Sequence, residues 1–238
     1  MTDPAARERE VTEILDDWDW VDGTCLVGGY AVSAYGKPRY SRDLDFVIPE
    51  SNKELTKDRL VENGFSIRPL LRPDRPDAFH DSITLERGLV SIDLMIGHVQ
   101  DKRTEVNVPG DWITSHFRET RLILITGSTR QPVRVCRPEA LWVLKLVAGR
   151  NQDLADLFAI SSETVNVEEI RTFLGKVEND ALRSRFRDEA RRLRSDRIFN
   201  ESESARFSRT SSESARSAWI HFKRRFSEIV FPGEEPMD

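Results

Sequence analysis

The chain has 238 residues, of which 32 % are charged and 38 % hydrophobic, and its formal net charge is −5. This length allows one large domain or two smaller ones, with a substantial buried core. The acidic balance argues against a wholly basic nucleic-acid binder but allows a local basic patch. The mean hydropathy of −0.51 indicates a soluble protein, and no apolar run approaches the roughly eighteen residues of a membrane span.

The N-terminal segment and the cysteines bear on the cellular compartment. Met1–Glu10 is charged and lacks the apolar region of a secretory signal peptide. Cys25 and Cys136 are the only cysteines, and both lie in apolar runs typical of strands. We therefore expect free, buried thiols in a cytoplasmic protein that does not associate with membranes.

The first predicted element is an amphipathic packing helix over Ala5–Trp18. After it comes the most informative stretch of the chain, Cys25–Ile48, which reads as strand, turn, helix, loop and strand. The turn is Gly28–Gly29, the helix is Tyr30–Tyr35 and the second strand is Asp43–Ile48.

That second strand places two carboxylates on one face. Residues i and i+2 of a strand point the same way, so Asp43 and Asp45 share a face. Adjacent carboxylates repel each other, and oxygen ligands on a rigid strand suit Mg²⁺. A glycine pair also lets a phosphate approach backbone N–H groups. The combination predicts a site for a metal-bound triphosphate. Taken singly, such aspartates are usually solvated strand residues and such glycines are usually a simple turn.

The sequence G-G-Y-A followed by R-Y-S-R-D-L-D-F resembles the signature of the polymerase-β-like nucleotidyltransferase superfamily. Within it, the stretch is most similar to the AbiE-type toxin nucleotidyltransferases of abortive-infection and toxin–antitoxin systems. Adenylyltransferases that inactivate aminoglycosides have a similar frame. The resemblance implies that Asp43 and Asp45 are catalytic metal ligands. It also implies nucleotide binding by Gly28, Gly29, Arg39, Ser41 and Arg42.

A helix is predicted over Ser51–Asn63, and two strands over Phe79–Glu86 and Leu89–Ile96 form a hairpin. The second strand, L-V-S-I-D-L-M-I, carries one acid, Asp93, which needs a partner or a metal in such apolar surroundings. The resemblance implies that Asp93 is the third catalytic carboxylate and a further metal ligand. An acid at a strand edge is the alternative. Asp81 competes for the role, but its polar surroundings explain it without a metal.

Further strands are predicted over Arg121–Thr126 and Pro132–Cys136, and Pro138 then opens a helix. This helix leads into the pattern K-x-x-x-G-R-x-x-D-x-x-D, which resembles the second motif of the toxin-like nucleotidyltransferases. The resemblance implies that Lys145 meets the triphosphate and stabilises charge on the departing pyrophosphate. A lysine that snorkels to the surface is the alternative. Asp153 and Asp156 would then hold Lys145 and Arg150, or the nucleotide, in place, and Arg150 is a further nucleotide-binding residue that the resemblance implies.

Helices are also predicted over Val167–Glu178, Asp180–Ile198 and Ala218–Val230. The second of these is rich in arginine. Its arginines, along Arg183–Arg197, are either a solvated charged face or a phosphate-binding patch for an RNA acceptor. The Ser-, Glu- and Arg-rich segment before the last helix is typical of a flexible linker.

Together these elements predict an α/β (α+β) fold, in which a polymerase-β-like nucleotidyltransferase core with a mixed sheet precedes a C-terminal helical region. The expected catalytic core spans residues 20–136, with the packing helix over 5–18 ahead of it. A helical region over 137–198 carries the lysine motif, and a linker over 199–217 leads to a last helix over 218–231.

The resemblance implies metal-dependent transfer of a nucleoside monophosphate from an NTP to an acceptor, with release of pyrophosphate. Mg²⁺ or Mn²⁺ would be held by Asp43, Asp45 and Asp93. The sequence leaves open an RNA acceptor such as tRNA, a protein, or a small molecule as in the aminoglycoside adenylyltransferases. The resemblance also implies a toxin with an antitoxin partner. The competing class of function is a non-catalytic partner protein that keeps the fold and acts through its basic helices.

Overall fold

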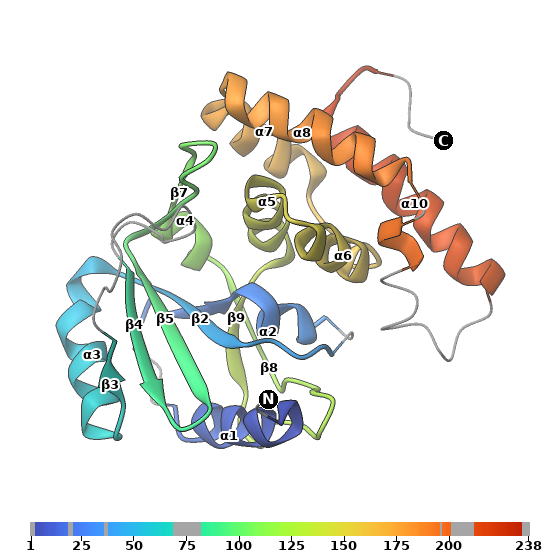
Figure 1. Cartoon of the computed structure of the whole chain (residues 1–238). Coiled ribbons are helices and arrows are strands. Elements are labelled where there is room, and N and C mark those ends of the chain that lie inside the picture. The colour runs from blue at the N-terminus through green and yellow to red at the C-terminus, as the bar shows by residue number, and fades with distance from the viewer. Residues whose placement is uncertain are drawn as a thin grey trace. The chain divides into compact units, whose positions relative to one another are not determined.

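The structure is a computed structural model that describes residues 3–18, 21–35, 38–68, 82–195, 197–200 and 212–234 (Figure 1). The chain divides into two compact units. Unit 1 comprises Met1–Arg103 and Asn107–Arg137, and unit 2 comprises Thr104–Val106 and Pro138–Asp238. Asp81 and most of the expected linker over 199–217 lie outside the described residues.

Unit 1 is built on a mixed sheet. Its described strands form one seven-stranded sheet in the order β3-β4-β5-β2-β1-β9-β8. β2 runs parallel to β5 and antiparallel to β1, and β1 runs parallel to β9. In sheet order these strands are Ser66–Ile67, Ser82–Arg87, Val90–Ile96, Asp43–Ile48, Cys25–Val27, Val133–Cys136 and Phe117–Thr120. A second sheet pairs β6, His98–Gln100, with β7, Asn107–Pro109.

The helices of unit 1 connect these strands. The first, α1, begins at Pro4 because proline suits the first turn of a helix and because Asp3 Oδ1 accepts a hydrogen bond from Ala5 N at 3.0 Å. Cys25 and Cys136 are free and buried in the sheet, which confirms the expectation from the sequence. The helices are α1 (Pro4–Asp16), α2 (Gly28–Ser33), the 3₁₀ turn η1 (Glu50–Asn52), α3 (Lys53–Glu62) and α4 (Gly110–Thr114).

The strand expected over Arg121–Thr126 is wrong. The partner of β9 is instead β8, which directly precedes that segment. Residues 121–126 form a loop whose only bridge pairs Ile123 with Ser128. β-Branched residues suggested a strand, but Ile123 is 59 % and Ile125 48 % exposed. Leu122 and Leu124 are buried and alternate with these isoleucines as they would in a strand. Both edges of β9 are already paired, with β1 and with β8, so the segment has no place beside β9.

Unit 2 is helical, as the sequence predicted. Its aromatic core is formed by side chains of helices far apart in the sequence. The ring centroids of Phe158 and Trp219 lie 5.1 Å apart, and those of Trp142 and Phe222 lie 6.1 Å apart. The last helix begins before the expected start because Ala215 is also buried in this core. The helices are α5 (Pro138–Ala148), α6 (Asn151–Ile160), α7 (Val167–Val177), α8 (Asp180–Leu193) and α10 (Ser212–Val230). Among the described helices of the chain, none is long and apolar enough to span a bilayer.

Candidate active site

Three carboxylates lie on one face of the sheet of unit 1. β2 and β5 are parallel neighbours, and their register pairs Asp43 with Ser91 and Asp45 with Asp93. Paired residues on adjacent strands share a face, and the intervening Leu44 is fully buried on the other face. Strand pairing therefore brings together three acids that the sequence separates.

Two hydroxyl groups orient two of these carboxylates. Ser91 Oγ donates a hydrogen bond to Asp43 Oδ1, and Thr84 Oγ1 donates one to Asp93 Oδ1 at 2.6 Å. Burial raises the pKa of Asp93 and the charge of Asp43 raises it further, while the hydrogen bond from Thr84 acts in the opposite direction. The sequence analysis missed both hydroxyls. The alternation S-x-D in β5 could have revealed Ser91, whereas Thr84 depends on the pairing of β4 with β5.

Gly28 lies directly against the D-x-D strand. Its φ is +68°, a conformation that glycine adopts without strain. A Cβ atom here would lie 1.9 Å from Asp45 Oδ2. At Gly29, a Cβ atom would lie 2.4 Å from Ser41 Oγ and 2.7 Å from Arg39 Nη2. The glycine pair is therefore required by the close approach of β2 and of the loop that precedes it.

That loop is anchored from two other elements. The carbonyl oxygen of Ser41 accepts hydrogen bonds from Tyr30 Oη at 3.2 Å and from Arg7 Nη1 at 3.5 Å. Burial raises the pKa of Tyr30 to about 12, so its hydroxyl keeps the proton that it donates. Arg39 Nη1 donates to the carbonyl of the next residue at 3.0 Å, and Arg42 is exposed. The sequence analysis assigned no role to Arg7 or to the hydroxyl of Tyr30, because no sequence pattern indicates that these groups reach the carbonyl of Ser41.

The chemistry of these donors fits a divalent cation. Carboxylate oxygens suit Mg²⁺ and Mn²⁺, and a carboxylate that receives one hydroxyl can still accept further contacts. Within the described part of the chain, however, no group of three or more His, Cys, Asp or Glu side chains is arranged so that it could hold a metal ion. The ligand types expected at Asp43, Asp45 and Asp93 are thus present on one face without a preformed coordination site.

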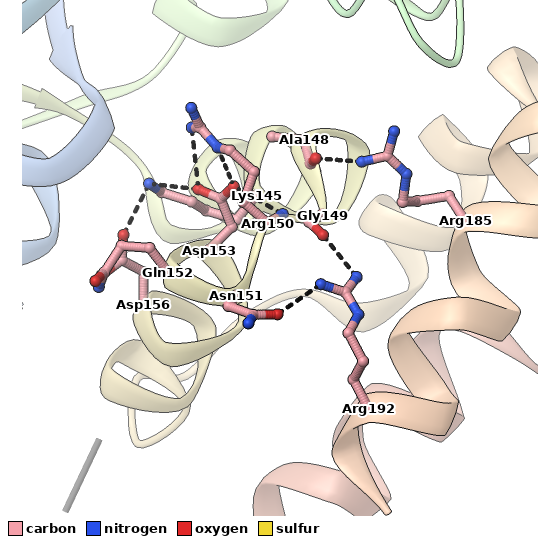
Figure 2. A network of polar contacts seen from close by, with 10 residues as sticks. All are labelled: Lys145, Ala148, Gly149, Arg150, Asn151, Gln152, Asp153, Asp156, Arg185 and Arg192. Atoms are coloured by element: carbon pink, nitrogen blue, oxygen red, sulfur yellow. Dashed lines mark hydrogen bonds and ion pairs between the residues drawn. The ribbon is translucent and has the colours of Figure 1, made fainter. Parts of the chain in front are cut away.

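A second charged cluster lies in unit 2, where α5 is followed by α6 (Figure 2). Lys145 is only 5 % exposed. Its Nζ lies 3.1 Å from Asp153 Oδ1 and 2.9 Å from Asp156 Oδ2, and both aspartates are buried. Lys145 therefore does not snorkel to solvent. It forms a buried ion pair with two acids of its own motif.

Arg150 joins this cluster from the start of α6. Its backbone N and its Nε donate to Asp153 Oδ2 at 3.1 and 2.7 Å, and its side chain is 63 % exposed. Burial alone would raise the pKa of Asp153, but the charge of Lys145 and the hydrogen bond from Arg150 outweigh it and lower that pKa. Gln152 Nε2, which the sequence analysis missed, donates to Asp156 Oδ1 at 3.2 Å. The motif is thus one hydrogen-bonded network.

The arginines of α8 do not form a uniform patch. Arg185 and Arg192 donate to backbone carbonyls of the turn between α5 and α6. Arg183 pairs with Glu178 at 3.0 Å, and Arg191 pairs with an acid on its own helix. The other arginines of the expected patch are exposed, and they are Arg187, Arg194 and Arg197.

Glu189 lies on α8 between the two arginines that contact the turn. It is fully buried, and neither carboxyl oxygen has a hydrogen-bond partner among the described residues. Burial raises its pKa well above the ordinary value, although the charges of Arg192 and Arg185 act in the opposite direction. The sequence analysis assigned no role to Glu189.

A family model described as nucleotidyl transferase AbiEii toxin, type IV TA system, matches residues 15–230 and confirms the resemblance seen in the sequence. No curated protein matches the chain. The crystal structure of ANT(2")-Ia in complex with adenylyl-2"-tobramycin is 15 % identical, with a TM-score of 0.44, over 78 % of this chain and 99 % of that one. A nucleotidyltransferase structure from H. pylori is 14 % identical, with a TM-score of 0.39, over 97 % and 96 %.

Proposed function

Because the chain belongs to the nucleotidyl transferase AbiEii toxin family, we propose that this nucleotidyltransferase moves the nucleoside monophosphate of an NTP to an acceptor and acts as a toxin. The observation that carries the proposal is the pairing of Asp45 with Asp93 on neighbouring parallel strands, with Gly28 against Asp45. The carboxylate oxygens of Asp45 and Asp93 therefore lie on one face of the sheet, and the backbone of Gly28, which has no side chain, lies directly against Asp45.

In the proposed reaction, a hydroxyl oxygen of the acceptor attacks the α-phosphorus of the NTP. The bond between that phosphorus and the α–β bridging oxygen breaks, and pyrophosphate leaves. Asp93 takes the hydroxyl proton, and Thr84 orients its carboxylate through the 2.6 Å hydrogen bond. A carboxylate of Asp93 that is held in one orientation accepts the proton faster than a freely rotating one, because less entropy is lost on reaching the transition state.

Mg²⁺ or Mn²⁺ would be held by Asp43, Asp45 and Asp93. A bound divalent cation supplies positive charge that stabilises the attacking and the leaving oxygens. Two neighbouring residues favour metal binding by these acids. Ser91 orients the carboxylate of Asp43 by a hydrogen bond, and Gly28 has no side chain that would overlap the carboxylate of Asp45.

The family resemblance assigns phosphate binding to two groups of residues, which are the backbone at the glycine pair in unit 1 and the cations of the second motif in unit 2. Arg150 exposes most of its side chain while Asp153 fixes its direction. Lys145 lies in the same hydrogen-bonded network. Positive charge near the β- and γ-phosphates stabilises the departing pyrophosphate. The remaining nucleotide contacts come from Gly28, Gly29, Arg39, Ser41, Arg42 and Asp156.

For the acceptor we propose an RNA such as tRNA, with an antitoxin as the protein partner, since the family description is that of a type IV toxin–antitoxin system. The exposed arginines of α8 support this choice, because guanidinium groups at a surface bind phosphates without regard to sequence. Arg185 and Arg192 are excluded from this role, since they are engaged inside unit 2. The exposed candidates are Arg187 on α8 and, after its end, Arg194 and Arg197; Arg191 is also exposed but pairs with Asp188 on its own helix.

The test is transfer of label from α-phosphate-labelled NTPs to total tRNA, to the protein itself and to a panel of aminoglycosides. Wild type should label RNA. Asp43→Asn and Asp45→Asn should each lose about 10²-fold or more of the rate, because each removes one charge that faces the cation at nearly constant shape. Asp58→Asn is the matched control, since Asp58 is an exposed aspartate on α3 of the same unit.

Each outcome decides one part of the proposal. Labelling of aminoglycosides alone would overturn the RNA acceptor and leave the reaction standing. If wild type labels none of the acceptors, and the Asn variants affect cell growth as wild type does, the proposed reaction is wrong.

A further inference from the structure

Three side chains of α8 meet the turn that joins α5 to α6. Arg185, Glu189 and Arg192 are spaced by four and three residues, so they lie on one face of the helix. Figure 2 shows both arginines directed at the turn, which consists of the residues from Ala148 to Asn151. This face of α8 is distinct from the exposed arginines that we propose for RNA.

The two arginines bind the polar groups of the turn. Arg185 Nη1 donates to the carbonyl of Ala148. Arg192 Nη2 donates to the carbonyl of Gly149 at 2.6 Å, and its Nη1 donates to Asn151 Oδ1 at 2.9 Å. The last carbonyls of a helix have no partner within that helix, and cations are favourable at its C-terminal end. The contacts therefore cap α5 from another helix.

Gly149 allows this close approach. Its φ is +58°, and its N–H donates to the carbonyl of Lys145 at 2.9 Å. A Cβ atom at this position would lie 2.2 Å from Glu189 Oε1 and 2.5 Å from Arg185 Cδ. α8 thus packs against the bare backbone of the turn, and no side chain separates them.

The turn is connected by the chain and by hydrogen bonds to Arg150 and Lys145, the cations of the second motif. Arg150 follows Gly149 directly, and its backbone N and its guanidinium both bind Asp153. The other oxygen of Asp153 binds Lys145. A displaced turn would therefore move Arg150, and through Asp153 it would move Lys145 as well.

We propose that Arg185 and Arg192 are positioning residues, which hold the turn so that Arg150 and Lys145 keep the arrangement that binds the triphosphate. The inference rests on the nucleotide-binding role proposed above for these two cations. It assigns α8 a part in NTP affinity that does not involve contact with the nucleotide.

The test compares Arg192→Ala with Arg225→Ala. Arg225 is a matched control because its Nη1 also donates to two oxygens at a helix end, the carbonyls of Ser161 and Glu163, at 2.7 and 2.8 Å. Ser161 follows the far end of the same helix, α6. Both variants remove one half-buried arginine and leave two acceptors without it.

The first readout is the dissociation constant of the NTP in excess Mg²⁺, measured by calorimetry. It should rise about tenfold or more in Arg192→Ala, because the guanidinium no longer donates its two hydrogen bonds to the turn. The dissociation constant should stay at the wild-type value in Arg225→Ala. If urea unfolding shows that the two variants lose equal stability, general destabilisation does not explain the difference in NTP affinity. Arg192→Lys keeps the charge but not the two-pronged geometry, and should recover part of the affinity.

The second readout is amide hydrogen exchange of the segment 145–156 without nucleotide. Exchange should be faster in Arg192→Ala and unchanged in Arg225→Ala. Equal NTP affinity in the two variants would overturn the positioning role. Tighter binding in wild type than in Arg192→Ala, without transfer to any acceptor, would support positioning while overturning the proposed reaction. No NTP binding by wild type would overturn both.

Discussion

Lys145 and Asp156 form a buried ion pair, with Nζ 2.9 Å from Oδ2, and Asp153 shares the same ammonium at 3.1 Å. Removing one partner of a buried pair leaves the other charge without compensation, which costs about 3–5 kcal/mol. Lys145→Ala should therefore lower the free energy of unfolding by about that amount, as well as impairing transfer. Urea unfolding measures it.

Lys176→Ala is the control for Lys145, because Lys176 is an exposed lysine on α7 of the same unit. It should change the free energy of unfolding by no more than about 0.5 kcal/mol. If both variants unfold at the same urea concentration as wild type, the buried pair does not exist in solution.

Gly28→Ala should impair catalysis and folding together. The new Cβ atom would overlap Asp45 Oδ2, and the φ of +68° is strained for alanine by about 1–2 kcal/mol. Displacement of Asp45 should lower the transfer rate by about 10²-fold or more. Gly127→Ala serves as control, since nothing lies within 4 Å of a Cβ atom there. Comparable transfer rates in the two variants would show that Asp45 does not need this space.

NTP binding should depend on a divalent cation. The carboxylates of unit 1 would repel a triphosphate unless a cation lies between them. Calorimetry should detect binding in Mg²⁺ or Mn²⁺, little or none in EDTA, and recovery when the metal is added back in excess. Equal affinity with and without EDTA would contradict the assignment of Asp43, Asp45 and Asp93 as metal ligands.

Glu189→Gln should stabilise the protein at neutral pH. The groups that act on this carboxyl are Arg192, Arg185, Asp153 and Asp188, and burial outweighs them and raises its pKa. A carboxyl whose pKa is higher in the folded than in the unfolded state favours folding when protonated. Its stabilising contribution is complete below the ordinary pKa of 4.5 and is lost as the pH rises through the raised value.

The measurement is urea unfolding of Glu189→Gln and wild type at several pH values. The variant should gain about 1.4 kcal/mol over wild type for each unit by which the folded pKa is raised. The gain should appear above pH 4.5 and be absent below it. Glu213→Gln, which changes an exposed glutamate of α10, should show no such trend. A pH-independent difference would mean that folding does not shift the pKa of Glu189, and a loss of stability in the variant above pH 4.5 would mean that Glu189 is ion-paired in solution.

The sequence by itself determined the family, the class of fold and the identity of the main charged residues. Strand alternation alone placed Asp43 and Asp45 on one face, because side chains alternate with a period of two in any strand. The three-residue spacing placed Asp153 within reach of Arg150 at the start of α6, whereas Lys145 lies on α5 and reaches Asp153 only because the chain turns at Gly149. Such inferences need only local backbone geometry, which follows from the spacing of residues along the chain.

Tertiary structure decided everything that depends on which elements become neighbours. The register of β2 with β5 brought Asp93 beside Asp45, and the pairing of β4 added Thr84. The packing of α8 on the turn after α5 makes Arg192 an internal contact, whereas the sequence had left it as either a solvated residue or an RNA contact. The strand predicted at Arg121–Thr126 is absent although Leu122 and Leu124 are buried, because β9 pairs with β1 and β8 and leaves that segment no place beside it. Chain order does not reveal such contacts, because they are selected by the packing of the whole unit.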